Sequence, residues 1–203
     1  FKRENAPEGA PEYCIEGCPH ADTCPYYAPR LYMDMSCTGW PVDVITTDLS
    51  LEGRRKALEE GPYGRCVYHC DNNVVDHQST AIEFDNGVTA TFNLSAFSAK
   101  VNRSLKIMCQ FGEIRAIEKP YLIETTDFRT DETTVTELDI HDRGHGGGDK
   151  AFVKDFMESY LHGVPFNSTL EHAIESHAMA LLAEESRKDN GNAKSVSQWM
   201  QGL

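Results

Sequence analysis

The chain has 203 residues and a formal net charge of −13, because 32 Asp and Glu outnumber 19 Lys and Arg. This balance argues against nucleic acid as a partner, since binding to phosphates relies on clustered Lys and Arg. No apolar run approaches the about 18 residues that a membrane span requires, and the first residues do not read as an export signal. We therefore expect a cytoplasmic protein that is long enough to form a hydrophobic core and has no membrane partner.

The first 30 residues contain five prolines, a density that interrupts helices and strands. We interpret residues 1–30 as a Cys- and Pro-rich arm that precedes a domain spanning 31–203. The arm carries Cys14, Cys18 and Cys24, with His20 between them. These four side chains could bind zinc, although the usual C-x2-C pairs are missing. Free thiols or local disulfides are the alternative.

A short amphipathic helix is predicted after the arm. Leu51, Arg54, Arg55 and Leu58 recur at helical spacing, and Gly61-Pro62 supplies a stop. Residues 30–60 are therefore expected to contain short, separate helices.

From about residue 65 to 140 the hydrophobic period changes to two, which is typical of strands. Asp85-Asn86-Gly87 joins the runs 77–84 and 88–96 and is a strong hairpin signal. Further strands are expected near 105–111, 113–117, 121–127 and 133–140. The pattern predicts an open-faced, mostly antiparallel sheet of five or six strands with one apolar face.

Two helices are expected to cover that face, one over 150–161 and one over 169–189, which gives an α+β fold. The segment 168–171, Ser-Thr-Leu-Glu, is typical of a capping box for the second helix. The buried stripe of this helix is predicted to contain Leu170, Ile174, Ala178 and Leu181, with His177 beside it as a core histidine.

A glycine-rich loop, 144–149, lies between the last strand and the first of these helices. Its three consecutive glycines leave backbone amides accessible beside a helix start, where Asp149 can act as N-cap. His145 adds a group that can exchange a proton near neutrality. The loop could hold a polar ligand, or it could simply be a turn that needs positive φ. Because no G-x-G-x-x-G or Walker pattern occurs, we expect no nucleotide-binding unit in the chain.

Several segments carry a resemblance to a known family. They are 24–32 (CPYYAPRLY), 64–78 (GRCVYHCDNNVVDHQ), 84–90, 112–115, 144–149 and 175–187. In this order and spacing they resemble the C-terminal domain of the glucose–fructose oxidoreductase, inositol dehydrogenase and MocA-type (Gfo/Idh/MocA) oxidoreductases. The resemblance implies a dihydrodipicolinate-reductase-like sheet domain that binds a sugar or polyol-like substrate and pairs subunits through its sheet.

The resemblance also implies a parent enzyme with an N-terminal Rossmann domain that binds NAD or NADP. The sequence starts at Phe1, so we expect a fragment that lacks this domain, holds no cofactor and is inactive alone. Glu118-Lys119-Pro120 matches the family's catalytic lysine motif but lies among the strands, so the role is not carried over to Lys119.

The expected substrate-binding residues are His145, Asp149, His141, Arg143, Tyr26 and Arg30. A homodimer or higher homo-oligomer is expected to form through a sheet face containing Thr89, Thr91, Asn93, Lys106, Met108 and Gln110. The rival interpretation is a stand-alone, non-catalytic binding or scaffold module, in which the Cys-rich arm could be a metal-dependent assembly element.

Overall fold

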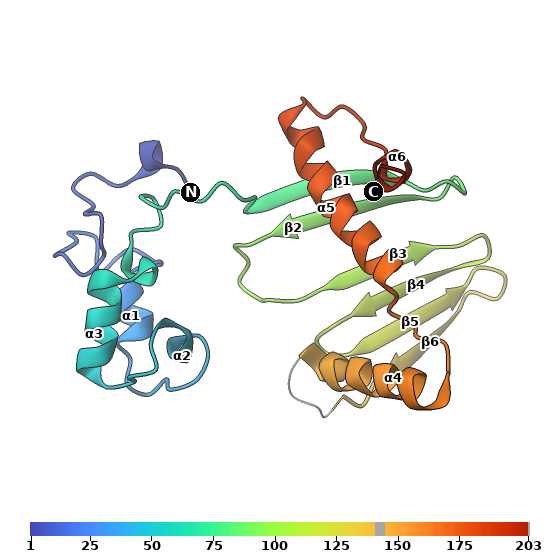
Figure 1. Cartoon of the computed structure of the whole chain (residues 1–203), viewed down its shortest axis with the longest axis horizontal. Helices are drawn as coiled ribbons and strands as arrows, with labels where there is room; N and C mark the ends of the chain where they lie inside the picture. The colour runs from blue at the N-terminus through green and yellow to red at the C-terminus, as the bar shows by residue number, and fades with distance from the viewer. Residues whose placement is uncertain (141–144, 203) are drawn as a thin grey trace. The chain divides into compact units, whose positions relative to one another are not determined.

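The computed structural model describes residues 1–140 and 145–202, and it confirms an α+β fold with open, antiparallel sheets (Figure 1). The chain divides into two compact units. Unit 1 contains residues 1–79 and 92–96, and unit 2 contains 80–91 and 97–203. No helix in the described ranges is both long enough and apolar enough to cross a membrane.

Unit 1 is a small helical unit in which the first 30 residues are part of the core. Its elements are η1 (Arg3–Asn5), α1 (Ala28–Tyr32), α2 (Val42–Ile45), α3 (Leu51–Glu60) and η2 (Pro62–Gly64). Cys14 and Ala28 are buried in one cluster with Leu58 and Cys66. Apolar side chains of the predicted arm therefore pack against residues far later in the sequence.

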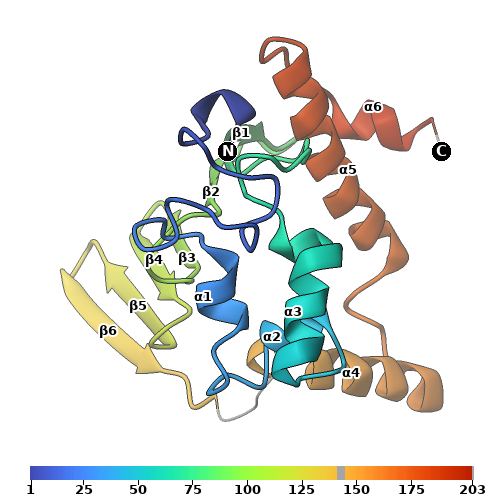
Figure 2. The same cartoon turned by 90° about the vertical axis from the view of Figure 1, so that its left-hand side faces the viewer.

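Helix α3 forms where the sequence predicts it. The Ser50 hydroxyl accepts a hydrogen bond from the Gly53 amide at 3.1 Å, which satisfies one free donor of the first turn. The Gly61 amide closes the last turn on the Ala57 carbonyl at 2.9 Å. Leu58 is fully buried, and the views at right angles both place α1 beside α3 (Figures 1 and 2).

Arg54 is a fully buried cation that ties α3 to the preceding loop. Its Nε donates to the Leu49 carbonyl at 2.9 Å, and its Nη2 donates to the Cys37 carbonyl at 2.9 Å. Its Nη1 donates to the carbonyls of Tyr32, at 3.2 Å, and Asp34, at 2.8 Å. The guanidinium thus replaces water at four main-chain acceptors, which a lysine with one nitrogen could not do.

The predicted hairpin is present. Strand β1 (His77–Glu83) pairs with β2 (Thr89–Ser95) in a two-stranded sheet. The Phe84 amide donates to the Val88 carbonyl at 2.8 Å across the Asp85-Asn86-Gly87 turn.

A second sheet contains β3 (Ser104–Met108), β4 (Gly112–Ile117), β5 (Leu122–Asp127) and β6 (Glu132–Glu137), paired antiparallel in chain order (Figure 1). The six strands are therefore split between two sheets instead of forming the single meander expected. Residues 96–103 join β2 to β3 without a tight hairpin turn, so local sequence does not enforce pairing there.

The register of this sheet separates two faces. One face carries Leu105, Ile107, Ile114, Ala116 and Ile123. Each of these residues pairs with another of them on a neighbouring strand, or lies two residues away from another on its own strand. Lys106, Met108, Glu113 and Arg115 share the other. Gly112 is required at the start of β4, since a Cβ there would collide with the Thr126 carbonyl oxygen.

The helices of unit 2 begin differently from the prediction. They are α4 (Gly148–His162), preceded by η3 (His145–Gly147), then α5 (Leu170–Lys188) and α6 (Val196–Met200). The N-cap of α4 is Gly147 in the left-handed region, so Asp149 lies inside the first turn and is not the N-cap. Thr169 caps α5 by accepting from the His172 amide at 3.3 Å.

The apolar faces of these helices are less covered than expected. In α5, Ala178 and Leu182 are buried whereas Leu170 and Leu181 are exposed, so the stripe is shifted by one residue at its end. His177 is exposed and contacts the Ala173 carbonyl at 2.7 Å, so it is not a core histidine. Helix α4 buries no residue in this chain.

Replacing Arg54 tests its structural role. Arg54→Met should destabilise the protein by about 3–5 kcal/mol, because it leaves buried carbonyls without donors. Urea unfolding followed by circular dichroism would measure the change. Arg55→Met on the exposed side of the same helix is the matched control and should change stability by less than about 0.5 kcal/mol. Equal effects of the two substitutions would contradict the role given to Arg54.

Candidate functional site

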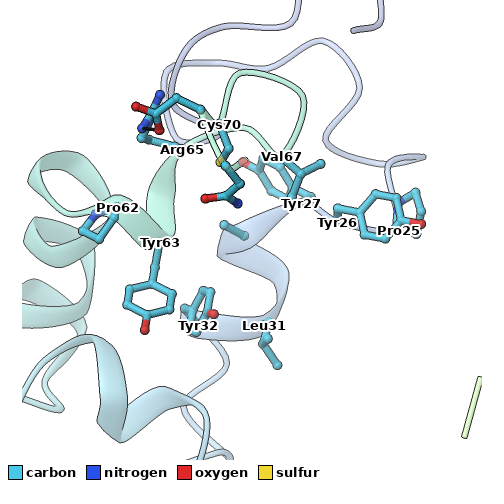
Figure 3. Close-up of a pocket in the computed structure, with 13 residues that line it drawn as sticks. Pro25, Tyr26, Tyr27, Leu31, Tyr32, Pro62, Tyr63, Arg65, Val67 and Cys70 are labelled. Carbon is cyan, nitrogen blue, oxygen red and sulfur yellow. Dashed lines mark hydrogen bonds and ion pairs between the residues drawn. The ribbon is translucent and has the colours of Figure 1, made fainter. Parts of the chain in front are cut away.

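Unit 1 contains a cavity of about 550 Å³ between two segments that are far apart in sequence (Figure 3). It is lined by Pro25, Tyr26, Tyr27, Ala28, Leu31, Tyr32, Pro62, Tyr63, Arg65, Val67, Cys70, Asp71 and Asn72. A cavity of this size, mostly apolar with a few polar groups, is typical of small-molecule sites.

Aromatic rings form much of its wall. Tyr32 and Tyr63 lie side by side in Figure 3, with ring centroids 6.0 Å apart and ring planes at 67°. Burial, together with the neighbouring Tyr63, raises the pKa of Tyr32 above its usual range. Its hydroxyl is therefore neutral at physiological pH and can both donate and accept a hydrogen bond.

The polar part of the cavity is organised by Arg65. Its Nη1 donates to Asp71 Oδ1 at 2.8 Å, and its Nη2 donates to the His69 carbonyl at 2.8 Å. The same Nη2 contacts Glu12 Oε1 at 3.4 Å. The hydrogen bond from Arg65 lowers the pKa of Asp71, so this carboxylate is ionised at neutral pH. Asn72, which follows Asp71 in sequence, is exposed and also lines the cavity.

Backbone pairing holds the Arg65 segment in place. Tyr13 and Arg65 form an isolated antiparallel bridge, with the Cys14 amide donating to the Gly64 carbonyl at 2.8 Å. Gly64 permits this approach, because a Cβ there would collide with the carbonyl oxygen of Leu58 at the end of α3. The cavity thus depends on a close contact that only glycine allows.

Glu12 supports the polar part from outside the cavity. Its carboxylate accepts from His69 Nδ1 at 3.0 Å and from Arg3 Nη2 at 3.0 Å, in addition to Arg65. Desolvation raises the pKa of Glu12, but the hydrogen bond from His69 and the charge of Arg3 together lower it by more, and the net pKa lies below its ordinary 4.5.

Of the two expected substrate-binding residues in segment 24–32, Tyr26 lines the cavity and Arg30 does not. The Arg30 guanidinium donates to the carbonyls of Ala21 at 2.7 Å, Asp22 at 3.1 Å and Cys24 at 2.9 Å. These bonds fix the turn that precedes α1, so the structure gives Arg30 a role in the fold.

The glycine loop is placed in unit 2. His145 Nδ1 lies 2.9 Å from Asp149 Oδ2, and both side chains are largely exposed. Neither residue lines the cavity of unit 1. Two other expected substrate-binding residues, His141 and Arg143, lie outside the described residues.

The thiols of the Cys-rich segment are all unbridged. His20 Nε2 lies 2.8 Å from the Glu8 carbonyl oxygen, a main-chain contact away from the thiols. Within residues 1–140 and 145–202, no three His, Cys, Asp or Glu side chains converge closely enough to hold a metal ion. Cys14, Cys18, Cys24 and His20 therefore do not form a preassembled centre of three thiolates and one imidazole.

Sequence reasoning missed Tyr32, Tyr63, Arg65, Asp71 and Asn72 as cavity residues. Four of them lie inside the segments 24–32 and 64–78, which carry the family resemblance. The signal that could have found them was the repeated presence of aromatic and polar residues in both segments. What the sequence did not reveal was the contact between them.

No family model, curated protein or solved structure matches this chain.

The ion pairs of Glu12 predict a pH-dependent contribution to stability. A carboxylate whose folded-state pKa is depressed stabilises the fold above its unfolded-state pKa, and this contribution is lost as pH falls through the folded-state pKa. Glu12→Gln should therefore lower the melting temperature at pH 7, and the difference from the unmodified chain should shrink below about pH 4.5. Thermal melts between pH 3 and 7 would measure this.

Glu59→Gln, an exposed position on α3, is the control and should have a small effect throughout. A Glu12→Gln defect that grows as the solution is acidified would show that the carboxylate charge does not stabilise the folded chain.

Proposed function

We propose that this chain is the substrate-binding and oligomerisation domain of an NAD(P)-dependent oxidoreductase that acts on a sugar or polyol-like carbinol. One observation carries the proposal. Two separate segments that resemble the Gfo/Idh/MocA family, 24–32 and 64–78, line the same cavity, although they lie far apart in the chain. The two segments were identified by sequence resemblance alone. That they line one cavity supports a common role in binding.

The chemistry of the cavity suits a polyol. The faces of Tyr32 and Tyr63 can pack against the C–H groups of a sugar ring, where they exclude water. Asp71 accepts hydrogen bonds, and Asn72 both donates and accepts them, so the pair can satisfy adjacent hydroxyls. Discrimination follows, because a substrate lacking one hydroxyl leaves a polar partner unsatisfied.

In the parent enzyme the chemistry would be divided between two domains. NAD or NADP, held by a Rossmann domain, would carry the hydride. The present residues would orient the carbinol carbon and exclude water, and we assign no catalytic or cofactor-binding residue to them. A cytoplasmic location is part of this proposal, since soluble nicotinamide pools supply the cofactor.

Calorimetric titration of the 203-residue chain with glucose, inositol and gluconate tests the cavity directly. At least one of these ligands should bind with a Kd at or below about 1 mM, which corresponds to about −4.1 kcal/mol. Asn72→Ala should weaken that binding by about 5-fold, because a substrate hydroxyl loses a hydrogen-bond partner. NADH should bind no tighter than about 100 μM.

His145→Ala is the matched control, since it removes a polar side chain from the glycine loop and leaves the cavity intact. It should change the affinity by less than about 2-fold. Loss of binding in His145→Ala with normal binding in Asn72→Ala would move the site to the loop. A chain that binds no polyol would favour the stand-alone scaffold.

We also propose that the chain forms a homo-oligomer through one face of the β3–β6 sheet. Met108 and Val135 share this face and are 77% and 53% exposed. Lys106 and Arg115 pair with Glu113 beside them, both at 2.8 Å. Alternating charges around exposed apolar side chains suit a self-complementary two-fold contact. Thr89 and Thr91, expected on the same surface, belong to the other sheet.

Sedimentation velocity would test this face. The unmodified chain should sediment as a dimer or larger species, and Met108→Glu with Val135→Glu should give monomers, because four like charges would be buried across a dimer contact. Thr91→Glu on β2 should leave the oligomer intact. An unmodified chain that is monomeric at high concentration would contradict the proposal, as would monomers from Thr91→Glu alone.

A further inference from the structure

We propose that Asp71 makes the cavity of unit 1 selective for uncharged polyols over sugar acids and sugar phosphates. The inference rests on the proposed function, because it names the class of substrate that the polyol site accepts. Asp71 is then a specificity-determining residue. Arg65, despite its positive charge, is not a subsite for a ligand carboxylate or phosphate.

The positive charge of Arg65 is already shared by protein acceptors. Its Nη1 donates to Asp71 Oδ1 at 2.8 Å. Its Nη2 donates to the His69 carbonyl at 2.8 Å and contacts Glu12 Oε1 at 3.4 Å. Both edges through which a guanidinium can form two parallel hydrogen bonds include Nη2. A ligand anion would therefore compete with these acceptors, and it would meet two carboxylates beside one cation.

The more exposed of the two charges at this end of the cavity is negative. The side chain of Asp71 is 86% exposed, whereas that of Arg65 is 25% exposed, and both residues line the cavity. The hydrogen bond from Arg65 lowers the pKa of Asp71, so the carboxylate is ionised at neutral pH. A ligand that enters from solvent thus encounters an accessible carboxylate and a guanidinium that is mostly covered.

The rest of the lining offers groups that suit an uncharged ligand. Among the described residues that line the cavity, Arg65 and Asp71 alone belong to the Asp, Glu, Lys and Arg types. Burial raises the pKa of the Cys70 thiol, so it is neutral at physiological pH. In Figure 3 the Arg65 side chain lies at one end of the lining and the rings of Tyr32 and Tyr63 lie at the other. An anion placed among these groups would lose hydration without gaining a free cation.

The charge of the whole chain acts in the same direction. Its 32 acidic and 19 basic residues give a formal net charge of −13. Such a surface repels anionic solutes, although salt screens the effect. A test of Asp71 must therefore separate its local charge from this general repulsion.

Two matched pairs of ligands test the selectivity: glucose with glucuronate, and myo-inositol with myo-inositol monophosphate. Within each pair the ring is the same and one member carries a negative charge. Titrations of the isotope-labelled 203-residue chain, followed by amide chemical shifts, would give the four affinities. At low salt the neutral member should bind about 5-fold tighter than its anionic partner, because like charges a few ångströms apart repel even in water.

Asp71→Asn removes the negative charge and keeps an oxygen that can accept from Arg65. It should reduce the preference for the neutral ligand to less than about 2-fold. Asp43→Asn is the matched control, because Asp43 is exposed on α2 and does not line the cavity. It makes the same change in net charge and should preserve the preference.

Salt provides a second measurement on the unmodified chain, which decides the question even if Asp71→Asn does not fold. The preference should shrink at about 1 M NaCl, where the Debye length is about 3 Å. Tighter binding of glucuronate or inositol monophosphate than of the neutral partner would overturn the selectivity and leave a sugar site in place. A preference that survives both Asp71→Asn and high salt would also overturn it, as would one that Asp43→Asn abolishes. A chain that binds none of the four ligands would refute the proposed function, and this inference with it.

Discussion

Unit 1 is organised around the guanidinium of Arg54. A cation placed out of contact with water needs hydrogen-bond partners, and each of the three guanidinium nitrogens of Arg54 donates to a main-chain carbonyl, the acceptors being Tyr32, Asp34, Cys37 and Leu49. The carbonyls belong to the chain that leaves α1 and to the chain that enters α3. One side chain therefore ties α3 to the chain that leaves α1, and α1 lines the cavity.

The second constraint is the contact of Gly64 with the end of α3. It allows residues 64–66 to run beside residues 12–14, which places Arg65 at the cavity and Cys66 beside Cys14. The proposed polyol cavity and the buried pair of Cys14 and Cys66 thus depend on the same Tyr13–Arg65 bridge.

The elements that the sequence predicts correctly depend on local signals. Helix α3 has a Ser50 cap and a Gly61 stop, and the hairpin has its Asp85-Asn86-Gly87 turn. The errors concern contacts between distant residues. The division into two sheets, the packing of residues 1–30 and the burial of Arg54 all depend on which segments meet, and local periodicity does not contain this information.

In the candidate site, too, the roles that the sequence does not reveal depend on contacts between distant residues. Tyr26 lines the cavity, whereas the guanidinium of Arg30 holds the turn before α1. Both lie in one short segment, so sequence alone offers no basis for separating their roles. Arg65 is held at the cavity by its bridge to Tyr13, and the N-cap of α4 is Gly147 in the left-handed conformation, not Asp149.

Native-state hydrogen exchange tests the shared framework most directly. If Arg54, Gly64 and the Tyr13–Arg65 bridge form one cooperative structure, the amides of Cys14 and Cys66 should open with the same free energy as those in the middle of α3. All three should respond equally to denaturant. Rapid exchange at Cys14 and Cys66 while α3 stays protected would show that the bridge is independent of α3, and the framework proposed for the cavity would be wrong.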